Sequence, residues 1–301
     1  MTKLKRSSKN LAKAALSKFL LAALCFCLCG CFFSAGKPTY NSQNVAKALQ
    51  DLALAEYKTE VSVKLVNSTL WIYMPVTNLF IPNPKKEKYP EKFQIAKNSG
   101  AFKGSSFVGE YNIKAVPVKD KTQDYKINKE VSGKIGDLWK IIRRVLFGFV
   151  PSERDRIKFV SMVIADIKNG FEVKEVFYAR DLKKVSYGLM SIWEFQHRVI
   201  QDSSVSPLVI GDKAGRHVEY KDITLAEFVQ KQIEYRISLK FQKPEVEQSA
   251  DIDREVAKII TETLQMYELK DIGEVKFRNL NSNTNTTLYG HDIWDTAEKR
   301  K

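Results

Sequence analysis

Residues 157–178, IKFVSMVIADIKNGFEVKEVFY, contain the clearest β-hairpin pattern of the chain. Residues 157–167 and 171–178 are both rich in β-branched, aromatic and other apolar side chains, which is typical of strands. Between them, Lys168-Asn169-Gly170 predicts a turn, because Asn-Gly supplies the positive φ angles that a tight hairpin requires. The apolar content of both arms predicts that this hairpin is central in its sheet.

Helical patterns lie on both sides of this hairpin. Apolar residues recur every three or four positions in four ranges: 136–149, 191–200, 223–241 and 251–267. The second range begins with a capping box formed by Ser191 and Glu194, and the third begins with one formed by Thr224 and Glu227. Pro244 stops the third helix. Residues 201–221 are expected to form a loop.

The N-terminal half repeats the order of helix and hairpin. Residues 44–57 predict a helix, and residues 61–74 alternate as two strands around a turn at Asn67-Ser68, with Pro75 as the end of the hairpin. Residues 77–134 are broken by prolines and glycines, so we expect only short strands there, such as 107–118.

The C-terminal end is simpler. A last strand is predicted over 275–280, followed by a polar tail over 281–301 that contains NSNTNTT and has little to bury. Hairpins and helices together favour an α+β fold, with antiparallel β-hairpins packed against several amphipathic helices, over a doubly wound parallel sheet. The predicted body is 44–280, with an alternative division into two subdomains near 120–135.

The composition is that of a globular protein. The chain has 301 residues, of which 44% are hydrophobic and 28% charged, which argues against wholesale disorder, collagen and a polytopic membrane protein. The formal net charge is +14. Six of the 49 basic residues and none of the 35 acidic ones lie in residues 1–30, so the remainder is only moderately basic. A modest excess suits anionic headgroups or wall polymers better than nucleic acid.

All four cysteines lie close together near the start of the chain. They are Cys25, Cys27, Cys29 and Cys31, and they end a segment with a basic stretch over 1–18 and an apolar stretch over 19–28. A basic stretch, a short apolar core and small residues at a cleavage position predict a secretory signal. The apolar run over 19–33 is shorter than the roughly 20 residues that a membrane-spanning helix needs.

The sequence Leu28-Cys29-Gly30-Cys31 resembles the lipobox of bacterial lipoproteins. The resemblance implies a signal peptide over 1–30, cleavage after Gly30, lipidation of Cys31 with acyl chains such as palmitate, and a lipidated tether over 31–43. Phe32 stands where Asp would retain a lipoprotein in the inner membrane, so the outer membrane is favoured in a diderm host. The body would then lie in the cell envelope, facing the periplasm or the exterior.

No catalytic motif is recognised in the sequence. Phosphate-binding loops, dinucleotide fingerprints, G-x-S-x-G and HExxH are absent. The body holds three histidines and, after cleavage, no cysteine except Cys31, so neither a metal site nor a cofactor is predicted. Surface positions are expected for His197, His217 and His291, including the Glu194/His197 pair on one helix.

Two interpretations remain. The first is a non-catalytic binding or envelope-assembly module, held at the membrane by its lipid anchor and contacting another envelope protein or a wall polymer, with no nucleic acid. The alternative is an envelope hydrolase with paired carboxylates. The alternative requires two of four acidic residues to face one cleft: Asp166, Glu172, Asp181 and Glu194.

Overall fold

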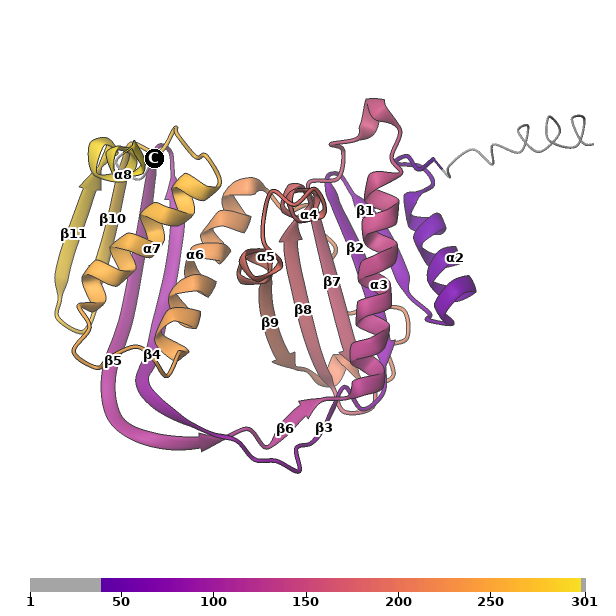
Figure 1. The fold of residues 1–301 in the computed structure, drawn as a ribbon, viewed down its shortest axis with the longest axis horizontal. Coiled ribbons are helices and arrows are strands. Elements are labelled where there is room, and N and C mark those ends of the chain that lie inside the picture. Colours follow the sequence, from indigo (N-terminus) through magenta and orange to yellow (C-terminus); the bar gives the residue numbers. More distant parts are fainter. Residues whose placement is uncertain (1–38, 299–301) are drawn as a thin grey trace, which may run out of the picture. The chain divides into compact units, whose positions relative to one another are not determined.

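Two mixed β-sheets organise residues 39–298, the part of the chain that the computed structural model describes. The first sheet has five strands in the order β1–β2–β7–β8–β9 (Figure 1). Their bounds are Ser62–Val66, Thr69–Val76, Phe159–Asp166, Phe171–Tyr178 and Ile200–Val205. Neighbouring strands are antiparallel except β2 and β7, which are parallel. The predicted hairpin, β7–β8, therefore lies in the interior of its sheet, as expected.

The second sheet has four strands in the order β11–β10–β5–β4. Their bounds are Thr284–Tyr289, Glu274–Asn279, Ser106–Thr122 and Lys88–Lys103. Here too one pair, β10–β5, is parallel, between two antiparallel hairpins. The chain passes between the sheets through a short two-stranded ribbon, β3 (Phe80–Pro82) with β6 (Tyr125–Ile127). A cut near 120–135 falls next to this ribbon, and each sheet takes strands from both sides of it.

Helices are distributed between the two sheets. One face of the five-stranded sheet packs against α2 (Val45–Tyr57), α3 (Lys129–Phe147), α4 (Ala179–Ser186) and α5 (Ile192–Arg198) (Figure 1). The second sheet carries α6 (Leu225–Gln242), α7 (Ile252–Met266) and α8 (Gly290–Glu298). The α+β class predicted from the sequence is confirmed.

Strand alternation explains why the five-stranded sheet is covered on both faces. In β2, Leu70, Ile72 and Met74 are buried against the helices α2 and α3, whereas Trp71 and Tyr73 are buried in the opposite core. All eight residues of β7 are buried. Because successive side chains of a strand point to opposite faces, a strand without a polar face requires a layer on each side.

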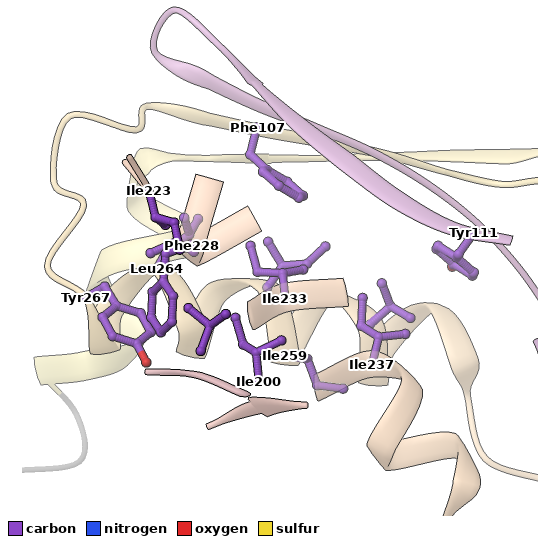
Figure 2. Close-up of a cluster of buried hydrophobic side chains, with 14 of the residues drawn as sticks. Phe107, Tyr111, Ile200, Ile223, Phe228, Ile233, Ile237, Ile259, Leu264 and Tyr267 are labelled. Atoms are coloured by element: carbon purple, nitrogen blue, oxygen red, sulfur yellow. The ribbon is translucent and has the colours of Figure 1, made fainter. Parts of the chain in front are cut away.

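Phe228 of α6 joins the second layer to the five-stranded sheet. Its ring lies 5.1 Å from Phe159 of β7 and 5.4 Å from Tyr267, at the end of α7, measured between ring centroids. Figure 2 shows Phe228 beside Leu264 and Tyr267, with Phe107 approaching the α6 residue Ile233 from the β4–β5 hairpin. One continuous core therefore connects both sheets through α6.

Several local predictions are confirmed. The helices over 44–57, 136–149, 191–200, 223–241 and 251–267 correspond to α2, α3, α5, α6 and α7. Both hydrogen bonds of the Thr224/Glu227 capping box are present, and the Ser191 side chain accepts from the Glu194 N–H. The central turn differs in detail. It spans four residues, 167–170, and within it only Gly170 has a positive φ, 74°.

The prediction of short strands over 77–134 is wrong. This region forms the longest hairpin of the described residues, β4 and β5, with 16 and 17 residues. Its glycines indicated breaks, but the Phe107 ring packs over Gly100, where a Cβ atom would collide with it. Glycine is therefore required for close aromatic packing here. The outer half of β5 is exposed on both faces, so it shows no apolar alternation.

Three other expectations also differ from the structure. Residues 281–301 were expected to be a polar tail, but β11 pairs with β10 and α8 follows it. The loop expected over 201–221 begins with the edge strand β9, whose side chains from Gln201 to Val205 are exposed. Pro75 lies inside β2, beyond the point where β1 ends opposite Tyr73; a proline is tolerated where a strand lacks a neighbour on one side.

Within residues 39–298, no helix combines the length and the apolar character needed to cross a bilayer.

The Phe228 contacts predict a large stability difference between two variants. Phe228→Ala removes a ring that is 1% exposed and should lower the free energy of unfolding by about 3–5 kcal/mol. Leu208→Ala alters a side chain that is 70% exposed and should change it by less than about 0.5 kcal/mol. Urea denaturation of both variants checks this, and equal losses would contradict the central position of Phe228.

Candidate functional site

The predicted lipidation and cleavage positions, Cys31 and Gly30, lie outside the described residues, as does the signal peptide. They stay predictions.

Asp166 supports the central turn. Its side chain is 1% exposed and accepts hydrogen bonds from the N–H groups of Leu79, Lys168 and Asn169, at 2.8, 3.2 and 3.1 Å. Burial alone raises the pKa of Asp166, but hydrogen bonds, above all from the Asn169 side chain, outweigh this and lower it. With both oxygens occupied by the turn, Asp166 has a structural role.

Asp181 and Glu194 are brought together, but by one shared cation. The Arg198 guanidinium lies 3.2 Å from Asp181 and 2.9 Å from Glu194. Asp181 is 2% exposed, and burial raises its pKa although Arg198 and Lys184 oppose the rise. A guanidinium between two carboxylates holds both in ion pairs, which is not the arrangement of an acid and a base around a scissile bond.

Glu172 and His217 form an unexpected polar cluster. The expectation that His217 lies at the surface is wrong, because its side chain is only 10% exposed. Its Nδ1 lies 2.6 Å from Asp212 and its Nε2 lies 2.9 Å from Glu172, which also accepts from the Ser204 hydroxyl. The imidazole therefore links β8 to the loop that precedes α6.

The protonation of this cluster follows from its geometry. Burial alone lowers the pKa of His217, but the hydrogen bonds to Glu172 and Asp212 outweigh it and raise the pKa above its usual range. For Asp212, burial is likewise outweighed by the His217 ring and by backbone N–H groups, which lower its pKa to about 2. With both ring nitrogens donating to carboxylates, His217 has no free nitrogen for a metal ion or for proton transfer.

The other two histidines lie at the surface, as expected. His197 is exposed on α5, and His291 is exposed beside Asp292, 3.1 Å away. Within the described part of the chain, no group of three or more His, Cys, Asp or Glu side chains is arranged to hold a metal ion.

The most site-like feature is a cavity of about 690 Å³ between α3, α4, α5 and the sheet, here called the α3–α5 cavity. Its apolar walls come from six side chains: Trp139, Leu182, Val185, Ile192, Phe195 and Val199. Trp139 stacks on Phe177 with ring centroids 4.4 Å apart and meets Phe195 edge-on at 5.7 Å. Mostly apolar cavities with a few polar groups are typical of small-molecule sites.

Glu175 is the acidic residue of this cavity. It lies on the same face of β8 as Val173 and Phe177, which pack toward the helices. Its side chain is only 9% exposed. Oε1 accepts a hydrogen bond of 2.8 Å from Gln201, directly opposite it on β9. Oε2 is buried and, among the described residues, accepts no hydrogen bond of normal geometry.

Burial governs the protonation of Glu175. Desolvation raises the pKa of its carboxyl, and the side chains of Gln201 and Trp139 only partly oppose this rise by interacting with the charged form. A buried carboxylate with one unsatisfied oxygen is costly, and such groups are concentrated at functional sites.

Sequence reasoning missed Glu175, although a signal was present. In β8 the alternating positions Phe171, Val173 and Phe177 are apolar, and Glu175 occupies the same series. An acidic residue on the apolar face of an interior strand indicates a buried carboxyl. The cavity around it is formed by α4 and α5, and α4 was not predicted.

Comparisons of the chain with protein-family models, curated proteins and solved structures found no match.

The His217 cluster predicts a pH-dependent stability. Because the folded pKa of His217 is raised, its contribution is complete below the unfolded value of about 6.5 and is lost as the pH rises through the folded pKa. The free energy of unfolding should therefore fall between about pH 6 and pH 8.5. His217→Ala should cost about 2 kcal/mol at pH 6, because two carboxylates lose their partner.

Denaturation of both proteins across this pH range is the measurement. A control is His291→Ala, which removes an exposed histidine and should keep the wild-type profile. If His217→Ala also keeps it, the cluster does not control stability.

Proposed function

We propose that this protein is a lipid-anchored envelope protein whose body is a non-catalytic binding module, and that the α3–α5 cavity is its ligand site. The observation that carries the proposal is the buried Glu175 carboxyl in an otherwise apolar cavity. The ligand class that fits is a small amphiphile, with an apolar part against Trp139 and Phe195 and a cationic or hydrogen-bond-donating group at Glu175.

The energetics favour a cationic group. Burial makes the charged form of Glu175 unfavourable in the free protein. A ligand ammonium group would give Oε2 a charge-assisted hydrogen bond, which contributes about 1.5–3 kcal/mol. The indole and phenyl rings beside it attract cations through their π faces. Binding therefore relieves a cost that the free protein carries.

The anchor part of the proposal has separate support. The basic and apolar N-terminal stretches and the Leu28-Cys29-Gly30-Cys31 motif predict lipidation of Cys31. One acyl chain gives only marginal membrane binding, whereas two or more hold a protein stably. The outer membrane of a diderm host remains the proposed location, and a second envelope protein or a wall polymer remains a proposed macromolecular partner.

The alternative of a carboxylate hydrolase has no specific observation in its favour. Among its four candidate residues, Asp166 holds a turn, Glu172 is bound by His217, and Asp181 shares Arg198 with Glu194.

The anchor is tested by metabolic labelling with a palmitate analogue. Wild-type protein should be labelled and should fractionate with membranes, and Cys31→Ser should lose the label, because the thioether requires the Cys31 thiol. Cys29→Ser provides the matched control and should keep the label. Labelling that survives Cys31→Ser would exclude this anchor.

The ligand site is tested with three water-soluble probes of equal chain length: hexylammonium, hexanoate and hexanol. Fluorescence titration of the purified protein should show hexylammonium binding most tightly. Glu175→Gln should weaken that binding by about 10- to 100-fold, which corresponds to the loss of one charge-assisted hydrogen bond.

Two controls make the result specific. Asp155→Asn also removes one negative charge, but from a side chain that is 94% exposed, and should leave binding unchanged. Glu175→Gln should also be more stable than wild type at pH 8, because the raised folded pKa makes the ionised form destabilising above the unfolded value of about 4.3. Equal affinity for all three probes would contradict the assigned ligand class.

A further inference from the structure

The segment that joins α4 to α5 exposes an unusual amount of apolar surface. Tyr187, Leu189, Ile192 and Trp193 are 66%, 76%, 53% and 72% exposed. We call these four side chains the apolar ridge. Single exposed apolar residues are ordinary, but a group of large ones in seven consecutive positions is typical of an interaction surface.

Basic side chains of α3 border this ridge. Lys140 and Arg143 line the α3–α5 cavity together with Ile192 and Ser186. A neighbouring cavity places Arg144 and Phe147 beside the same Ser186. Lys140 and Arg144 form ion pairs with Asp137 and Glu56, whereas exposed Arg143 makes no ion pair within residues 39–298. The surface next to the ridge therefore offers positive charge.

The body also begins beside this ridge. The Tyr40 N–H donates to the Gly148 carbonyl at 2.9 Å, just after the end of α3, and the Tyr40 carbonyl accepts from Val150. Phe147, the last residue of α3, meets the Tyr187 ring edge-on, with centroids 5.3 Å apart. Figure 1 shows α4 near the end of α3 that leads toward β7. Cys31 precedes Tyr40 by nine residues, so a fully extended chain would reach at most about 32 Å.

We propose that the apolar ridge inserts into the surface of an anionic lipid bilayer, with Lys140, Arg143 and Arg144 facing the headgroups. Aromatic and aliphatic side chains next to basic ones are the composition of surfaces that lie in a membrane interface. The proposal rests on the anchor proposed above for its location, since lipidated Cys31 would hold this end of the body at a bilayer. It adds an orientation, in which the α3–α5 cavity opens next to the membrane.

An anionic bilayer fits this surface better than a protein partner does. A protein groove would have to match the shape of four side chains on a short connecting segment. A bilayer accepts such side chains without a fixed shape, and its anionic headgroups complement the unpaired Arg143. The Trp193 and Tyr187 rings suit the interface, where one end of an amphipathic ring is apolar and the other is hydrated.

Tryptophan quenching tests the docking. The full processed protein is placed in vesicles that contain anionic and neutral phospholipids with brominated acyl chains, which quench tryptophan on contact. Wild-type fluorescence should be quenched relative to vesicles without bromine. Trp193→Phe should lose most of that quenching, and Trp294→Phe, which alters a residue of α8, should keep it. Unchanged quenching in Trp193→Phe, or none in wild type, would overturn the proposal.

Charge is tested in the same assay. Arg143→Gln combined with Lys140→Gln should lower quenching in anionic vesicles to the level seen in neutral ones. Equal quenching of wild type in both vesicle types would overturn the role of anionic headgroups. Leu189→Ser, a second ridge variant at an exposed position, should lower the quenching of Trp193 without changing unfolding.

The anchor and the docking can fail separately. The intact mass of the protein shows whether lipid is attached. A lipidated protein that floats with vesicles but shows no Trp193 quenching would keep the anchor and reject the docking. An unlipidated protein with Trp193 quenching would reject the anchor and keep the docking.

Discussion

Burial of β7 on both faces is the constraint on which the rest of the structure depends. All eight of its residues are buried, so the five-stranded sheet needs one layer of α2, α3, α4 and α5 and a second layer that includes α6. The parallel pairing of β2 with β7 places two hairpins side by side, and a parallel pair requires a long crossover connection. The β4–β5 hairpin and α3 lie in that crossover, which is how the second sheet comes to be inserted between the strands of the first.

The next strand, β8, separates two acidic residues of different fate. Glu172 and Glu175 lie on opposite faces because three positions of a strand reverse the side-chain direction. Glu172 meets His217 and Asp212, which neutralise it and connect β8 to the loop before α6. Glu175 meets Gln201, aromatic rings and a cavity. The same residue type therefore acts as a structural link on one face and as a candidate ligand contact on the other.

The cavity and the apolar ridge are made by the same two short helices. Ile192 contributes to both, since it lines the cavity and is 53% exposed. On our proposals, a body held by Cys31 and docked through the ridge would receive its ligand from the membrane surface, where amphiphiles are concentrated. The two proposals depend on different residues, Glu175 and Trp193, so each can be rejected without the other.

The sequence by itself determined the local elements whose signals are contained within a few residues. The capping box of α6, the turn at Gly170, the apolar stripes of α3 and α7, and the apolar arms of β7 and β8 could all be predicted, because each depends on near neighbours. Glu175 on an apolar face was also visible in the sequence, although only the folded strand shows what it faces.

Only the tertiary structure decided which strands share a sheet and where the polar cluster forms. The pairs β2–β7 and β10–β5 join residues about 90 to 170 positions apart, and the choice between such partners is made by packing of whole layers. The edge strands β9 and β11 are mostly exposed, so they carry no alternating pattern to detect. His217 gives no local sign of its two carboxylate partners, because Glu172 lies 45 positions away and reaches it only once β8 is in place.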